Sequence, residues 1–65
     1  MISCIGDNIN GHVTTFYFSD DSTIDSIQNH KKSPPVFEVS SKENITEAQK
    51  NAIMKWSFCN VEVVS

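Results

Sequence analysis

The first eighteen residues form two strand-prone segments with one turn signal between them. Ile2–Ile9 and His12–Phe18 are rich in β-branched and aromatic residues, and Asn10-Gly11 separates them. Asn-Gly is the strongest short-range hairpin signal, because both residues tolerate the positive φ that a type I′ turn requires. The sequence therefore predicts a β-hairpin over these residues.

Alternation along this hairpin predicts which side chains share a face. With Asn10-Gly11 as a two-residue turn, Ile5 lies opposite Phe16. Tyr17 is out of phase with its neighbours and points to the other side of the sheet. Gly6 interrupts the first strand, and a bulge there would shift the register by one residue. The face predicted to be the core carries Ile5, Ile9, Phe16 and Phe18.

The polar pattern changes between residues 19 and 35. Acidic residues precede Thr23–Asn29, basic residues follow it, and Ser33-Pro34-Pro35 then ends the segment. This charge order suits the helix macrodipole and the usual helix boundaries, so we expect a helix of two turns. An irregular segment held by Ile24 and Ile27 is the alternative. The flanking charged residues are Asp20, Asp21, His30, Lys31 and Lys32.

The remaining residues predict a strand, a helix and a final strand. Val36–Ser40 alternates with period two, and so does Asn60–Val64. Between them, Thr46-Glu47-Ala48-Gln49 is typical of a capping box, which predicts a helix that runs to about Ser57. The helix stripe expected to face the core consists of Ala48, Ala52 and Trp56.

These elements sum to an α+β fold, a two-layer sandwich in ββαβαβ order within one small domain, residues 1–65. A four-stranded sheet would carry one or two helices on one face, and its last two strands would be parallel. The aromatic residues expected in the core are Trp56, Phe16, Phe18 and Phe37. The other face of the sheet would stay open to a partner, and its expected contact residues are Tyr17, Thr15, Val13, Glu62 and Val64.

Composition narrows the classes of partner. The chain has 65 residues, with five lysines, eight acidic residues, no arginine and a formal charge of −3. A basic nucleic-acid-binding face is therefore disfavoured. No signal peptide is apparent, and Ala52-Ile53-Met54 is as long as any apolar run. We therefore expect a cytoplasmic protein without membrane contact.

Candidate chemical groups are few, and each has a simpler structural role. No pair among Cys4, His12, His30 and Cys59 has the close spacing of zinc ligands, so we expect reduced thiols, no metal and no cofactor. Asp20, Asp21 and Asp25 are expected to cap a helix, because the calcium-loop pattern is absent. Asn44-Ile45-Thr46 matches a glycosylation sequon but is better explained by the helix cap. We therefore expect a protein that is not an enzyme.

The function expected from these features is binding. The leading hypothesis is a small regulator or inhibitor that binds another protein, of the kind that phages and mobile elements encode. The alternative is a single-stranded nucleic-acid module that uses Tyr17 and lysine side chains on the open sheet face. We also expect a symmetric homodimer, since so small a sheet gains stability by burying its open face against a second copy.

Overall fold

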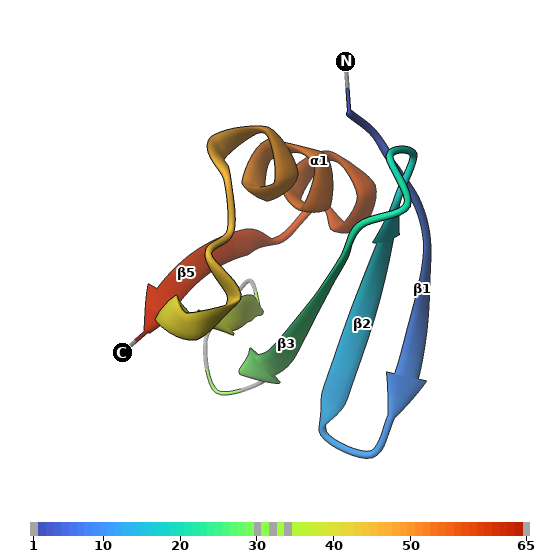
Figure 1. Cartoon of the computed structure of the whole chain (residues 1–65). Helices are drawn as coiled ribbons and strands as arrows, with labels where there is room; N and C mark the ends of the chain where they lie inside the picture. The colour runs from blue at the N-terminus through green and yellow to red at the C-terminus, as the bar shows by residue number, and fades with distance from the viewer. Residues whose placement is uncertain (1, 30, 32, 34, 65) are drawn as a thin grey trace.

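A computed structural model describes residues 2–29, 31, 33 and 35–64. In this part of the chain, a five-stranded mixed sheet is covered on one face by one α-helix (Figure 1). The strand order follows the sequence, and only the last two strands are parallel. The elements are β1 (Cys4–Asn10), β2 (Val13–Phe18), β3 (Thr23–Asn29), β4 (Val36–Ser40), the 3-10 helix η1 (Ser41–Glu43), α1 (Glu47–Ser57) and β5 (Asn60–Val64).

The hairpin β1–β2 is present, but its turn lies one residue later than predicted, which displaces the pairing partner of Ile9 by two residues, from His12 to Thr14. Asn10 pairs with Val13, so the two loop residues are Gly11 and His12. Gly11 has a φ of 62° at the first loop position, whereas His12 at the second has no positive φ, as in a type II′ turn, and Asn10 stays in the strand. The type I′ turn assumed from Asn-Gly is therefore wrong.

Two β1 residues predicted to lie in the core, Ile5 and Ile9, are exposed. The pairing shifts between Cys4 and Gly6, so Ile5 lies at a bulge and is 62% exposed. Ile9 lies opposite Thr14, close to the hairpin turn and far from α1 (Figure 1), and is 70% exposed. Neither isoleucine joins the core, whereas Phe16 and Phe18 are buried as predicted.

The predicted first helix is wrong, because Thr23–Asn29 forms strand β3. β3 pairs antiparallel with β2, and Ile24 lies opposite Phe16. Burial alternates along β3, and the Ser26 hydroxyl donates a hydrogen bond to the carbonyl oxygen of Thr14 at 3.0 Å. The sheet consequently has five strands rather than four, and the order ββαβαβ does not hold. His30, Lys32 and Pro34, at the predicted helix end, lie outside the described residues.

Of the three acidic residues expected to cap that helix, Asp20 and Asp21 instead lie in the turn between β2 and β3, and Asp25 lies within β3. The Asp20 carboxylate accepts hydrogen bonds from the backbone N–H and the hydroxyl of Ser22. These bonds lower the pKa of Asp20 below its ordinary value. Asp21 has a φ of 69°, a left-handed conformation that aspartate tolerates in turns.

The β4–α1–β5 unit confirms the prediction. α1 spans Glu47–Ser57, and β5 returns parallel to β4 with Phe37 opposite Val61. The capping box is complete: Thr46 Oγ1 accepts from the Gln49 backbone N–H at 3.1 Å, and Gln49 Oε1 accepts from the Thr46 N–H at 3.0 Å. Two orphan amides at the start of the helix are thereby satisfied.

The core lies between α1 and the sheet. Phe16 packs edge-to-face against Phe37, with ring centroids 5.0 Å apart. Ile53 is the innermost apolar residue of α1, and the wholly or almost wholly buried large side chains are Phe16, Phe18, Ile53 and Val39. Of the stripe predicted to face the core, Ala52 is buried beside Ile53, whereas Trp56 is 45% exposed and Ala48 is exposed as well.

Candidate binding surfaces

The five predicted contact residues share the sheet face that lies opposite α1, which we call the open face. On β2, the outward residues Val13, Thr15 and Tyr17 alternate with buried ones. On β5, Glu62 lies beside Glu38 of β4, out of phase with the core residues of both strands. Val64 follows two residues later on the same side. The geometry thus brings these residues to one face, and their contact with a partner stays a prediction.

A groove of about 330 Å³ lies on the open face where β3 and β4 separate. The two strands pair only from Ile27 to Asn29. Beyond that point η1 approaches β3, and Glu43 accepts a hydrogen bond from the Asp25 backbone N–H at 3.1 Å. The groove is lined by Val13, Asp25, Ser26, Ile27, Glu38, Ser40, Glu43 and Val64. We call this concavity the open-face groove.

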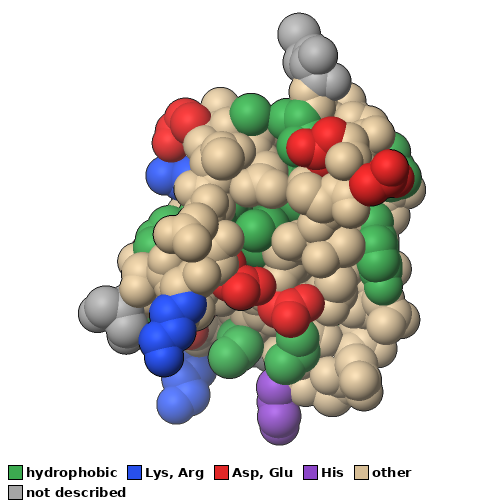
Figure 2. All heavy atoms as spheres, in the orientation of Figure 1, with side chains coloured by type: hydrophobic (Ala, Val, Ile, Leu, Met, Phe, Trp, Pro, Cys, Tyr) green, Lys and Arg blue, Asp and Glu red, His purple; other side chains and the backbone are tan. Residues whose placement is uncertain are grey.

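The groove combines apolar and acidic side chains. Val13, Ile27 and Val64 are its exposed hydrophobic residues. The carboxylates of Asp25, Glu38 and Glu43 surround them, and no lysine of the described residues lines the groove. Figure 2 shows acidic side chains directly beside hydrophobic ones in the lower middle of this view. Such a surface attracts cations and repels phosphates.

One hydrogen bond organises the acidic part of the groove. Thr15 Oγ1 donates to Asp25 Oδ1 at 2.7 Å across β2 and β3. Thr15, a predicted contact residue, therefore orients the carboxylate of a groove residue that sequence reasoning missed. Asp25 and Ile27 were missed because their segment was assigned to a helix, which gave the wrong side-chain period. The β-branched Thr23 and Ile24 were the available strand signal.

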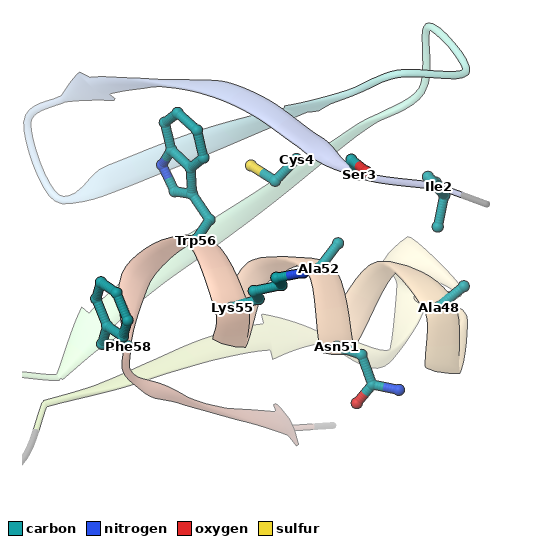
Figure 3. A pocket seen from close by; sticks show the side chains of 9 residues that line it. All are labelled: Ile2, Ser3, Cys4, Ala48, Asn51, Ala52, Lys55, Trp56 and Phe58. Carbon is teal, nitrogen blue, oxygen red and sulfur yellow. The ribbon is translucent and has the colours of Figure 1, made fainter.

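A second groove, of about 610 Å³, separates α1 from the N-terminal end of β1. We call it the helix groove. In Figure 3 the side chains of Ala52 and Trp56 point from α1 toward the strand that carries Cys4, and Asn51 points the other way. Burial raises the pKa of the Cys4 thiol above its ordinary value. The groove is lined by Ile2, Ser3, Cys4, Ala48, Asn51, Ala52, Lys55, Trp56 and Phe58.

Phe58 is unusual in both conformation and exposure. It terminates α1 with a φ of 57°, a left-handed conformation that favours glycine or asparagine. Its side chain is also 90% exposed. Neither feature stabilises the isolated chain, because a side chain strains the left-handed conformation and an exposed ring buries little apolar surface.

The other candidate groups named from the sequence are two cysteines and two histidines. Cys4 and Cys59 are free thiols, and no group of three metal-ligating side chains comes together among the described residues. His30, considered as a zinc ligand, lies outside them. No described helix has the length and apolarity needed to cross a membrane.

Comparison of the chain with models of protein families, with curated proteins and with solved structures finds no match.

Proposed function

We propose that this chain is a non-enzymatic regulator or inhibitor that binds another protein through the open-face groove. The recognised segment carries lysine or arginine side chains next to aliphatic ones. One observation carries the proposal: exposed Val13, Ile27 and Val64 lie among three carboxylates, and no described lysine lines the groove.

The geometry favours a short extended segment. An extended peptide places alternate side chains on one side, so aliphatic groups can cover Val13 and Ile27 while flanking cations reach Glu38 and Asp25. Cationic groups near these carboxylates also accelerate association by electrostatic steering. Affinity then comes from the buried apolar contact, and the acidic rim sets which partners are accepted.

The same charges weaken the nucleic-acid alternative. A single-stranded nucleic acid requires a positive groove along its phosphates and aromatic stacking platforms. The open face offers Tyr17 as an aromatic group, but its groove is lined by carboxylates. We therefore retain protein binding as the proposed function.

Titration with defined probes tests the proposal. Three probes are added to ¹⁵N-labelled protein: an extended peptide in which lysine and valine alternate at every second position, with serine between them, so that both kinds of side chain share one side; the same peptide with glutamate for lysine; and a short oligothymidine. We expect amide shifts at Val13, Ile27, Glu38 and Val64 with the lysine peptide only, and weaker binding as salt rises. Equal shifts with oligothymidine, or lysine-peptide shifts confined to α1, would contradict the proposal.

A matched pair of variants locates the charges that matter. The double variant Asp25→Asn and Glu38→Gln retains the size of both side chains, and the amide oxygen still accepts from Thr15. We expect it to bind the lysine peptide at least about tenfold more weakly, since two charge pairs are lost. Glu47→Gln, an exposed acid on α1, serves as the control and should leave binding unchanged.

A further inference from the structure

The exposed side of α1 bears a stripe that is complementary to itself. Ala48, Asn51 and Lys55 are exposed at helical spacings of three and four residues, and Phe58 continues the stripe beyond the helix. This spacing places the three side chains on one face of the helix, the seam, where a second helix can pack against them. Glu47, at the start of the helix, flanks the seam, whereas the positive charge of Lys55 lies near its end.

We propose that two copies of this chain associate through antiparallel α1 helices around a two-fold axis near Asn51 and Ala52. In this arrangement Lys55 of one copy lies over Ala48 of the other. Glu47 is adjacent to Ala48, so the Lys55 ammonium reaches the Glu47 carboxylate of the second copy, and the symmetry forms this pair twice.

The small size of Ala48 and the charges of Glu47 and Lys55 both favour a second copy of this chain as the molecule that packs on the seam. The small Ala48 leaves room for the methylene stem of Lys55, which can pack on apolar surface while its ammonium group pairs with an acid. One acid and one base on each seam leave no net charge to attract a basic or an acidic partner. A two-fold arrangement, by contrast, matches unlike charges on both sides.

The exposed aromatic residues gain a role in this dimer. The two-fold axis places Phe58 at the far end of the seam, near Ile45 of the second copy, which is half-buried against the core. Trp56 lines the helix groove next to the seam and becomes less exposed to solvent. Aromatic side chains at such positions contribute strongly to association. The proposed interface differs from the open-face dimer that the sequence alone suggested.

Charge reversal gives a test that depends on the pairing itself. Lys55→Glu places acid against acid in the homodimer, and Glu47→Lys places base against base. By sedimentation equilibrium, we expect each single variant to raise the dimer dissociation constant about tenfold or more relative to the unmodified chain. An equimolar mixture of the two variants should regain the original affinity, because the heterodimer again pairs unlike charges at both positions.

Controls separate association from folding and from net charge. Lys42→Glu on η1 makes the same change in net charge at an exposed site away from α1, and it should leave the dissociation constant unchanged. Circular dichroism melts establish that each variant is folded. If a reversed variant does not fold, Lys55→Gln and Glu47→Gln replace the reversals and should each weaken the dimer by a few-fold.

Two outcomes would overturn the proposal. The unmodified chain could sediment as a monomer at roughly 1 mM, a concentration at which even weak specific dimers form. Alternatively, the mixture of reversed variants could dimerise no better than either variant alone. The emission of Trp56, the single tryptophan, provides an independent readout, because dilution of the dimer should shift it toward longer wavelength.

Discussion

Replacement of Phe16 by alanine tests the core assignment most directly. Its side chain is fully buried and packs edge-to-face on Phe37 at 5.0 Å. Removal of a buried phenylalanine costs about 3–5 kcal/mol, which includes the cavity left behind and the lost ring contact. A domain of this length has a total stability of roughly 3–10 kcal/mol. The variant should therefore lose roughly a third or more of its total stability and unfold at a much lower urea concentration than the unmodified chain.

Tyr17 provides the matched comparison, because it neighbours Phe16 on β2 but points away from α1. It is 40% exposed, so Tyr17→Ala should cost less than about 1–2 kcal/mol and leave the chain folded. The variant should also bind a partner of the open face more weakly. Urea unfolding followed by circular dichroism measures both stabilities. A folded Phe16→Ala beside an unfolded Tyr17→Ala would refute the assignment of the two sheet faces.

Three further substitutions test local features of the fold. Thr46→Ala removes the helix cap and should cost about 1 kcal/mol, which lowers the melting temperature by about 4–8 °C in calorimetry. Phe58→Gly, measured in the Lys55→Glu background at a concentration at which that variant sediments as a monomer, should raise the melting temperature, because glycine adopts the left-handed conformation without strain; a lower value would contradict this explanation. Asp20→Asn should make the free energy of unfolding depend less on pH in the acidic range. The pKa of Asp20 is lower in the folded chain, so its contribution is present above pH 3.8 and is lost as the pH falls through that lowered pKa.

Local signals predicted the parts of the fold that depend on neighbouring residues. The Thr46–Gln49 capping box involves four consecutive residues, and the helix that it starts ends at Ser57 as expected. The parallel β4–α1–β5 unit followed from two alternating segments joined by that helix. Phe16, Phe18 and Phe37 were assigned to the core because their alternation leaves little choice in a small sheet.

Strand β3 could not be identified from local pattern, because Ile24 and Ile27 are three residues apart and suit a helix as well as a strand. Pairing with β2 makes this segment a strand, since Ile24 lies opposite Phe16 and the Ser26 hydroxyl donates a hydrogen bond to the Thr14 carbonyl oxygen. Local sequence pattern was also insufficient to identify all residues of the open-face groove. Alternation placed Val13 and Val64 on the open face, but Asp25 joins the groove only through this long-range pairing.

The two proposals combine into a prediction about avidity. α1 covers one sheet face and the open-face groove lies on the other, so a dimer formed through α1 leaves both grooves exposed on its outer sides. Such a dimer can engage two copies of a basic segment on one target, and the second contact benefits from a high effective concentration. Lys55→Glu should therefore leave the affinity for a soluble lysine–valine peptide unchanged. It should accelerate dissociation from a surface densely coated with that peptide, as measured by surface plasmon resonance. Equal dissociation rates of Lys55→Glu and the unmodified chain from the dense surface would show that the two grooves do not act together.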